Sequence, residues 1–378
     1  MKMDSASESE SQAPSGVLHR AIEAIDFGST GKLFDEIRNF LALHPGLPSE
    51  SVLTLTYFAF AIQFPECCNI WPFASVVASD LVGSSLFLRM FACLSIEPVQ
   101  LGEITLNSLL TLPESPRATL LVIDQLTPNG ELARVLRVLS RPGSRILRQG
   151  KFHDIFIPTL VCTAEPLRDR WILDQALQVS LTPTRGSLPH LDSQKLAEYA
   201  RQLKGKLLRY RELNLAAVRA SHFDAPELGL PIREIASMLG NSIADDPSLQ
   251  RLLPMLLEPQ DRDARTRRTD SIEAVVIEAA LFLTHQLNRS KARVGEFATI
   301  ANSIFKGRGD SIHLDPREVG NHLRALGLFS ERLGRAGRGI RFTSAIRRKI
   351  HDLARAFDVR SVQGEARCEF CTECETAK

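Results

Sequence analysis

The strongest constraint on this chain is an apolar run that stops abruptly on an acidic residue. Residues 118–123 read Ala-Thr-Leu-Leu-Val-Ile, which has the length and β-branched content of a buried strand. Asp124 follows immediately, and the next residue is Gln125. Because parallel sheets bind their ligands at the carboxyl ends of their strands, we expect Asp124 to lie at the ligand-binding edge of a sheet.

The composition is that of an ordinary globular protein. Of the 378 residues, 44% are hydrophobic and 24% are charged, which allows a sizeable buried core. The length predicts roughly two or three domains. The formal net charge is only +2, and a near-neutral total can hide one basic domain balanced by acidic segments. The charge of each segment therefore has to be considered separately.

No targeting signal or membrane span is expected. Residues 1–15 are rich in Ser and Glu and lack the apolar core of a secretory signal, so we expect a disordered tail. The longest apolar stretch, residues 53–62, is about half as long as a membrane-spanning helix. Such a chain favours the cytoplasm, where thiols stay reduced. Four of its cysteines have apolar neighbours, as core thiols do: Cys67, Cys68, Cys93 and Cys162.

The hydrophobic pattern predicts helices followed by an α/β layer. Residues 16–70 carry apolar residues at three- and four-residue spacing, which predicts a helical N-terminal segment. In residues 71–190, short apolar runs alternate with helical stretches, which indicates a parallel sheet. The expected strands are residues 73–78, 118–123, 152–163 and 177–181, with a helix over residues 130–139.

The first of these strands leads into a loop that partly fits a phosphate-binding motif. Such a loop needs glycines so that backbone N–H groups can surround the phosphates, a lysine to reach the outer phosphates, and a hydroxyl for magnesium. Against G-x-x-x-x-G-K-[ST], the sequence reads Ala78-x-x-x-x-Gly83-Ser84-Ser85. One glycine and the hydroxyl are present, but the lysine is absent. The alternative is an ordinary turn between a strand and a helix.

Residues 72–183 resemble the P-loop ATPases of the primase-helicase type, an AAA+ or superfamily 3-like group in the replication proteins of phages, plasmids and other mobile elements. The resemblance is clearest in residues 104–110, 119–125 and 152–165. It implies a P-loop-like α/β fold with a nucleotide site at the edge of the sheet.

The resemblance also assigns roles to individual residues. It implies that Ser85 and Asp124 lie beside magnesium and that Thr163 senses the γ-phosphate. The expected nucleotide site consists of Gly83, Ser84, Ser85, Asp124, Gln125 and Thr163.

The departures from the family pattern imply that this site has degenerated. Ser84 replaces the P-loop lysine, which removes a major electrostatic contact with the β- and γ-phosphates. Gln125 replaces the catalytic glutamate, and a glutamine can hold water but cannot accept its proton at neutral pH. Neither Arg168 nor Arg170 aligns with an arginine finger. We therefore expect no catalytic residue, negligible turnover and at most weak binding of ATP and Mg²⁺.

Residues 191–268 are expected to form a helical segment that ends in a linker. Residues 192–215 predict a long helix whose basic residues form a solvated face. Shorter helices are expected over residues 231–239 and 248–257. Residues 262–268, Arg-Asp-Ala-Arg-Thr-Arg-Arg, have no apolar periodicity and read as a polar linker.

Residues 269–358 resemble a winged helix-turn-helix domain. A third helix should begin at Asp315, because an N-cap carboxylate, Pro316 and Glu318 together form a helix-start signal. Two short β-like runs then surround a turn rich in glycine and arginine, which predicts a hairpin. The expected elements are residues 272–287, 294–305 and 315–327 as helices, 328–333 and 339–343 as strands, and 345–357 as a closing helix.

The charge of this region fits a nucleic-acid binder. Residues 289–360 contain roughly sixteen Lys and Arg against seven Asp and Glu. In this motif the third helix enters the major groove, where Asn and Arg match the edges of adenine and guanine. Winged helices also serve as protein-interaction modules, so that alternative stays open. The expected DNA contacts are Arg317, Asn321, His322 and Arg324 on the helix and Arg335, Arg338 and Arg341 on the wing.

Residues 359–378 carry three regularly spaced cysteines, Cys368, Cys371 and Cys374. This spacing could chelate zinc or an iron–sulfur cluster, but a structural zinc needs four ligands and no fourth is obvious nearby. We therefore favour a flexible tail with exposed thiols, and Zn²⁺ is not expected. His351, in the closing helix, is expected to be a structural residue.

Two classes of function remain. The favoured one is a non-hydrolysing P-loop-like protein that binds DNA or serves as a scaffold beside replication proteins of a mobile element, with oligomerisation open and no membrane partner. The alternative is an active ATPase that remodels nucleic acid. The substitutions at Ser84 and Gln125 favour the first.

Overall fold

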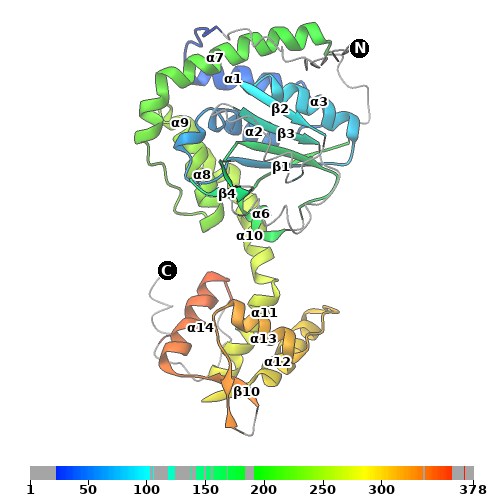
Figure 1. The fold of residues 1–378 in the computed structure, drawn as a ribbon, viewed down its shortest axis with the longest axis vertical. Helices are drawn as coiled ribbons and strands as arrows, with labels where there is room; N and C mark the ends of the chain where they lie inside the picture. Colours follow the sequence, from blue (N-terminus) through cyan, green and yellow to red (C-terminus); the bar gives the residue numbers. More distant parts are fainter. Residues whose placement is uncertain are drawn as a thin grey trace, which may run out of the picture. The chain divides into compact units, whose positions relative to one another are not determined.

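The chain folds into two compact units, Met1–Leu257 and Glu258–Lys378, which are described separately (Figure 1). The boundary between them falls within one helix, α10 (Leu253–Thr269). The computed structural model describes residues 23–102, 105, 118–123, 137, 142–148, 150–154, 156–167, 169–183, 191–334, 337–359 and 370.

A five-stranded parallel sheet forms the centre of the first unit, so the expected parallel α/β core is confirmed. The strand order is β2-β3-β6-β1-β7, and every neighbouring pair is parallel. β6 therefore lies between β3 and β1. The strands are β1 (Phe73–Ala78), β2 (Glu97–Leu101), β3 (Ala118–Ile123), β6 (Thr159–Thr163) and β7 (Leu177–Leu181).

The central strands β1, β3 and β6 are mostly apolar, and their described residues are almost all buried. All five residues of β6 are buried. Helix α3 (Leu81–Ala92) packs on β1 and β3. Side chains from β1, β3 and β6 also form a buried cluster with Ile172 of α6 (Arg170–Gln175). Burial on both faces favours continuous apolar runs, which is the pattern of residues 118–123.

Helices that precede the sheet strands in the sequence and helices that follow them complete this unit. Helix α2 contacts α1, α8 and β7, and nine of its residues are buried. Among the described helices of the chain, none is long and apolar enough to span a lipid bilayer. The helices are α1 (Thr30–Leu41), α2 (Ser49–Ala61), η1 (Pro65–Cys67), α7 (Ser193–Ala220), α8 (Leu230–Asn241) and α9 (Pro247–Gln250).

Residues 16–22 of the predicted helical segment lie outside the described residues, and the first described part of that segment is not helical. Residues 23–29 have no regular structure, and α1 starts at Thr30. Gly28 has a φ of 75°, and the side chain of Ser29 accepts a hydrogen bond from the Lys32 backbone nitrogen as the helix cap. A left-handed glycine followed by an N-cap serine ends any continuous helix at that point.

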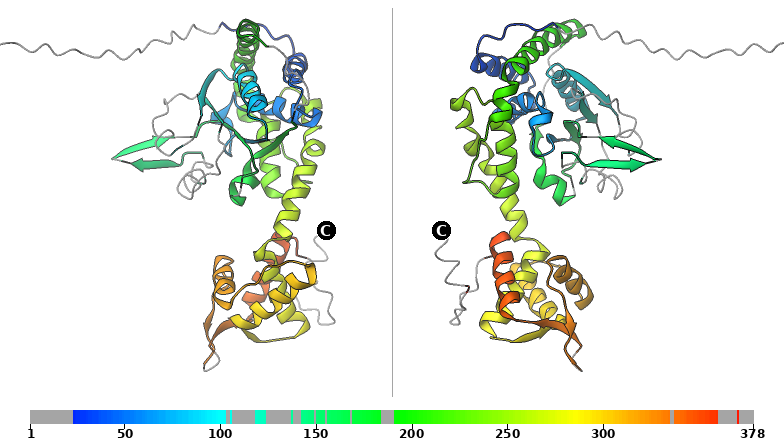
Figure 2. Two further views of the ribbon diagram at one scale, coloured as in Figure 1. Left: turned by 90° about the vertical axis from the view of Figure 1, so that its right-hand side faces the viewer. Right: turned by 60° about the vertical axis from the view of Figure 1, so that its left-hand side comes forward.

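The predicted strand over residues 152–163 is two strands. β5 (Lys151–Asp154) pairs with β4 (Arg145–Arg148) in an antiparallel hairpin that projects from the sheet (Figure 2), whereas β6 begins only at Thr159. Pro158 lies between them, and a proline cannot donate a ladder hydrogen bond. The helix expected over residues 130–139 lies outside the described residues except for Arg137.

The second unit combines helices with a small antiparallel sheet of order β8-β10-β9. Phe297, Val319, Leu323 and Ile350 are among the side chains of its own core. The strand β8 was not expected from the sequence. The elements are α11 (Ile272–Leu281), the π-turn η2 (Phe282–Gln286), β8 (Lys291–Arg293), α12 (Val294–Arg308), α13 (Pro316–Ala325), β9 (Glu331–Arg332), β10 (Arg338–Arg341) and α14 (Ser344–Ala356).

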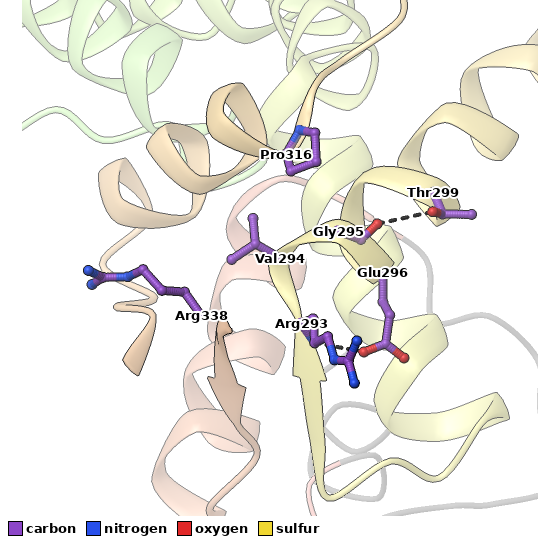
Figure 3. Close-up of a pocket in the computed structure, with 7 residues that line it drawn as sticks. All are labelled: Arg293, Val294, Gly295, Glu296, Thr299, Pro316 and Arg338. Carbon is purple, nitrogen blue, oxygen red and sulfur yellow. Dashed lines mark hydrogen bonds between the residues drawn. The ribbon is translucent and has the colours of Figure 1, made fainter. Parts of the chain in front are cut away.

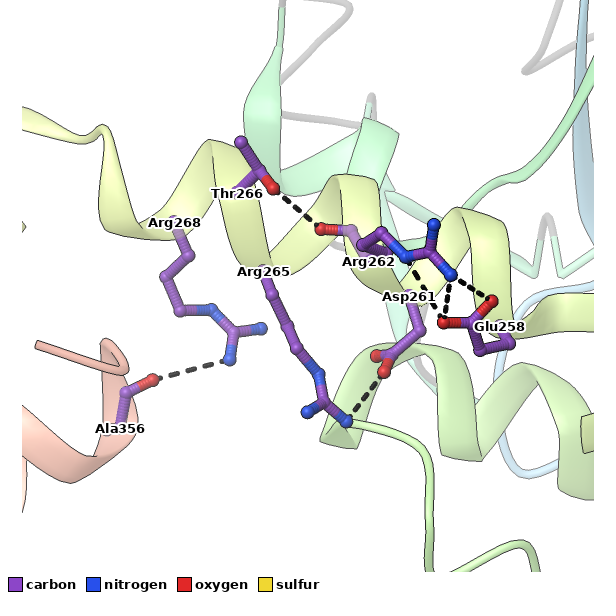
Figure 4. Close-up of polar contacts among 7 residues, drawn as sticks. All are labelled: Glu258, Asp261, Arg262, Arg265, Thr266, Arg268 and Ala356. Atoms are coloured by element: carbon purple, nitrogen blue, oxygen red, sulfur yellow. Dashed lines mark hydrogen bonds and ion pairs between the residues drawn. The ribbon is translucent and has the colours of Figure 1, made fainter.

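Residues 262–268, interpreted above as a polar linker, are helical because α10 continues through them (Figure 4). Arg262 pairs with Glu258 at 2.6 Å, and Arg265 pairs with Asp261 at 2.7 Å. These pairs are four residues apart, where helical side chains face one another and support an otherwise polar helix. The absence of apolar periodicity therefore does not exclude a helix here.

Candidate functional site

The segment predicted as a phosphate-binding loop is the first turn of α3. Only Ser79 and Asp80 separate the end of β1 from this helix. Asp80 is the N-cap: its Oδ1 accepts from the Val82 nitrogen at 3.0 Å and its Oδ2 from the Gly83 nitrogen at 3.1 Å. The predicted loop residues Gly83, Ser84 and Ser85 therefore lie within the helix, not in a wrapping loop.

Ser84 and Gly83 both form hydrogen bonds with other residues of the protein. The Ser84 side chain is 2% exposed, and its Oγ donates to the Asp80 carbonyl oxygen at 2.6 Å. The Gly46 nitrogen donates to Nδ1 of His44, so the His44 Nε2–H donates to the Gly83 carbonyl oxygen at 3.0 Å. Burial lowers the pKa of His44, which favours this neutral form, although the bond to Gly83 and the charge of Asp80 act in the opposite direction.

Thr163 lies at the same sheet edge but also has an internal partner. It is the last residue of β6, pairs in register with Val77 of β1, and its Oγ1 donates to the Glu165 carbonyl oxygen at 2.7 Å. The sheet thus brings Thr163 and the start of α3 to neighbouring strand ends. Asp124, Gln125 and Arg168 lie outside the described residues, as does the side chain of Arg170.

Three of the predicted DNA-contacting residues form one exposed face of α13. Arg317, Asn321 and Arg324 are all exposed, and their spacing of four and then three residues places them on one side of a helix. Asp315 caps this helix: its Oδ1 accepts from the Glu318 nitrogen, and Glu318 accepts from the Asp315 nitrogen, both at 2.8 Å. Val319 and Leu323 point into the core, which fixes the rotation of the helix.

His322 does not belong to this face. Its Nδ1 lies 2.9 Å from Oε1 of Glu273 on α11, and its side chain is 27% exposed. The sequence placed His322 near Arg317 and Arg324 by helical spacing, but helical spacing alone does not show the contact with α11. His322 therefore links two helices of the unit.

The predicted wing residues have different surroundings. Arg338 is exposed at the start of β10 and donates to the Ser330 carbonyl oxygen at 2.9 Å. Arg341 is also exposed and pairs with Glu331 across the hairpin at 2.7 Å. Arg335 lies outside the described residues.

A hollow of about 470 Å³ lies beside the start of α13 and was not expected from the sequence (Figure 3). It is formed where β8 enters α12, where α13 begins, and at Arg338 of β10. The Arg293 nitrogen donates to Oε2 of Glu296 at 2.7 Å at the start of α12. The residues that line the hollow are Arg293, Val294, Gly295, Glu296, Thr299, Pro316 and Arg338. Glu296, three residues after Arg293, was the sequence signal that a helix begins at this point, since a glutamate at that position can cap the helix.

The C-terminal cysteines Cys368, Cys371 and Cys374 lie outside the described residues, but Phe370 among them is described and is 4% exposed. Its ring lies 6.0 Å from that of His351, which in turn lies 5.0 Å from His285. Burial lowers the pKa of His351 to about 4. Within the described part of the chain, no group of three or more His, Cys, Asp or Glu could hold a metal ion.

The described cysteines of the first unit are free thiols, and Cys68, Cys93 and Cys162 are buried, whereas Cys67 is partly exposed. Burial raises the pKa of Cys93 to about 11 and also raises the pKa of the other three. These thiols therefore stay protonated and unreactive at neutral pH.

Comparison with known proteins assigns no family. No family model matches the chain, and no curated protein matches it. One solved structure that is similar is described as "Structure of Drosophila ORC bound to DNA". It has 12% sequence identity and a TM-score of 0.21, and the match covers 93% of this chain and 96% of that chain. A TM-score this low supports no conclusion about fold or function.

Proposed function

We propose that this protein binds DNA through its second unit, a winged helix-turn-helix domain, and that its α/β unit is a P-loop-like scaffold that does not hydrolyse ATP. The exposed face of Arg317, Asn321 and Arg324 on α13 carries the proposal. The order of helices α11, α12 and α13 followed by strands β9 and β10 supports the proposal, because the sequence predicts three helices and then a hairpin.

The chemistry of this face suits a major groove. Arginine can bind O6 and N7 of guanine with two donors, and asparagine can bind N6 and N7 of adenine. The buried Val319 and Leu323 fix the rotation of α13 about its axis. Arg317, Asn321 and Arg324 therefore all project from the same exposed side of the helix. Arg338 and Arg293 line the neighbouring hollow, where they supply positive charge for the phosphates that flank the bases.

Among the described residues of the α/β unit, the start of α3 is poorly suited to phosphoryl transfer. A phosphate that approached the first turn of α3 would meet the Asp80 carboxylate on the backbone donors it needs, and like charges repel. Ser84 occupies the position of the missing lysine and is buried. We therefore assign this unit a scaffolding role, with replication proteins of a mobile element as the partners that the sequence resemblance implies.

Binding of labelled duplex DNA, measured by fluorescence anisotropy over a range of salt concentrations, tests the DNA-binding proposal. We expect Arg317→Ala, Arg324→Ala and Arg338→Ala combined to weaken binding by at least about tenfold. The matched control combines Arg201→Ala, Arg209→Ala and Arg262→Ala, which removes three exposed arginines from α7 and α10. Equal losses of DNA affinity in both variants would show that only the net charge of the protein matters. No loss of affinity in the first variant would show that the DNA-binding surface lies elsewhere.

ATP hydrolysis by the purified protein tests the scaffold proposal separately. We expect no turnover with or without DNA and Mg²⁺. Turnover that disappears in Asp124→Ala would establish the alternative, an active nucleic-acid-remodelling ATPase. DNA binding and hydrolysis are independent readouts, so either half of the proposal can fail alone.

A further inference from the structure

Phe329 presents an aromatic ring to solvent in the turn between α13 and β9. It is 70% exposed, whereas the other exposed large apolar residues described in the second unit, Leu287 and Ile312, are 46% and 43% exposed. A single exposed apolar side chain is common on protein surfaces. Whether Phe329 has a role therefore depends on what surrounds it.

The backbone on both sides of Phe329 is fixed by the fold. Leu328 is 1% exposed, and its nitrogen donates to the Leu323 carbonyl oxygen at 2.7 Å. On the other side, Arg338 donates to the side-chain oxygen of Ser330 at 3.3 Å and to its carbonyl oxygen at 2.9 Å. The ring is thus carried by a backbone that is already ordered, so a ligand that binds it does not have to pay for ordering the turn.

The turn carries an excess of positive charge. Its acidic residue, Glu331, is paired with Arg341 at 2.7 Å. The cations that bond to the backbone of the turn or flank it in the sequence are all exposed: Arg324, Arg332, Arg338 and Lys349. An aromatic ring among cations fits an anionic partner that has flat aromatic faces, and a nucleic acid has both properties.

The turn continues directly from the face of α13 that is proposed to bind DNA. Arg324 lies in the last turn of this helix, and its carbonyl oxygen accepts from the Gly327 nitrogen at 2.9 Å. Gly327 has a φ of 69°, a left-handed conformation that ends the helix. Phe329 follows two residues later, so the Cα atoms of Gly327 and Phe329 are at most about 7 Å apart. DNA bound at Arg324 is therefore within reach of the ring.

In paired duplex DNA each base is stacked on its neighbours, so a side chain can stack on a base only where that order is interrupted. Building on the DNA-binding function proposed above, we propose that Phe329 stacks on an unpaired base. The second unit then binds best to duplex DNA that adjoins an unpaired segment. The face of α13 holds the paired part, and the turn after α13 holds the unpaired base.

Fluorescence anisotropy of the full chain with two labelled duplexes tests this proposal. The duplexes have the same ends, and one contains a central segment of unpaired bases. At one fixed salt concentration, we expect the unmodified protein to bind the duplex with the unpaired segment about fivefold to 150-fold more tightly. This is the range that one base stacked on an aromatic side chain contributes.

Three variants assign the effect to the ring. Phe329→Ala should abolish the preference and leave the affinity for the paired duplex unchanged, whereas Phe329→Trp should keep the preference because an indole also stacks. Phe152→Ala is the matched control, since Phe152 is 64% exposed in β5 of the first unit, and it should change neither affinity. Both positions are exposed, so the melting temperature should stay the same in all three variants.

Photo-cross-linking gives a second readout that does not depend on affinity. A 5-iodouracil base in the unpaired segment should attach on irradiation to the peptide that contains Phe329, as identified by mass spectrometry. The same base placed in the paired part should not attach to this peptide.

Several results would overturn the proposal while leaving DNA binding by α13 intact. They are equal affinity of the unmodified protein for the two duplexes, a preference that persists in Phe329→Ala, a preference that Phe329→Trp loses completely, and cross-linking confined to other peptides. An equal loss of affinity for both duplexes in Phe329→Ala would assign the ring to paired DNA instead. Failure to bind either duplex would refute the proposed DNA-binding function itself.

Discussion

Oδ2 of Asp80 accepts a hydrogen bond from the backbone nitrogen of Gly83 at 3.1 Å. Together with the bond from Val82 to Oδ1, this contact places a carboxylate on the donors that a bound anion would use at the start of α3. One side chain therefore both stabilises the beginning of the helix and opposes phosphate binding.

Asp80→Ala should destabilise the first unit. The substitution leaves the backbone N–H groups of Val82 and Gly83 without their acceptor, and loss of an N-cap costs about 0.5–2 kcal/mol. Asp80→Asn keeps an acceptor oxygen and should cost less. Urea denaturation followed by circular dichroism measures both, and equal losses in the two variants would contradict the capping role.

The buried His44 should make the first unit less stable in acid. Burial lowers the pKa of His44 from 6.5, so the unfolded chain takes up a proton at a higher pH than the folded protein does. The stabilisation is complete above pH 6.5 and is lost as the pH falls toward the lower folded pKa. The opposing influences on this imidazole are its bond to Gly83 and the charge of Asp80.

Urea denaturation at a series of pH values measures this effect. His44→Gln should be less stable than the unmodified protein at neutral pH, and its stability should depend less on pH below 6.5. An unchanged pH dependence in His44→Gln would assign the acid sensitivity to other groups.

Gly205→Ala should destabilise the protein although Gly205 lies inside helix α7. Alanine normally stabilises a helix relative to glycine by about 1 kcal/mol. Here an added Cβ would lie 2.6 Å from the Glu23 carbonyl oxygen and 2.7 Å from a carbon of Ile25. Gly307→Ala in α12 is the control, since its Cβ would meet nothing within 4 Å, and it should stabilise. A rise in melting temperature for Gly205→Ala would show that residues 23–25 do not pack there.

Leu323→Ala and Arg324→Ala should separate the two faces of α13. Leu323 is fully buried, and its truncation should cost about 2–5 kcal/mol. Arg324 is exposed, so Arg324→Ala should weaken DNA binding without changing the melting temperature. Thermal unfolding and fluorescence anisotropy on the same samples measure both effects. Destabilisation by Arg324→Ala would argue that this face packs against the protein.

His322→Gln should leave DNA affinity unchanged. Its imidazole contacts Glu273 on α11, so its loss should affect the stability of the unit and spare the exposed face of Arg317 and Asn321. The same anisotropy assay checks this expectation. A loss of affinity comparable to that of Arg324→Ala would restore His322 to the DNA-contacting set.

Local patterns were sufficient for much of the architecture. The strands at residues 73–78 and 177–181 are found where the short apolar runs predict them, and α13 begins at its Asp315 cap. Apolar continuity and capping are properties of adjacent residues, so a sequence displays them directly. The polar helix over residues 262–268 was missed because ion pairs replace apolar periodicity there.

The amino-acid sequence alone thus indicated the strands of the parallel sheet, the start of α13 and the basic character of residues 289–360. Each of these features depends on residues only a few positions apart. Packing in three dimensions was needed to show that His44 contacts the Gly83 carbonyl oxygen, that His322 pairs with Glu273, and that Phe370 lies against His351. The last two contacts join residues 49 and 19 positions apart. Such pairs meet only when separate elements pack, because no local spacing encodes which distant side chain will be opposite.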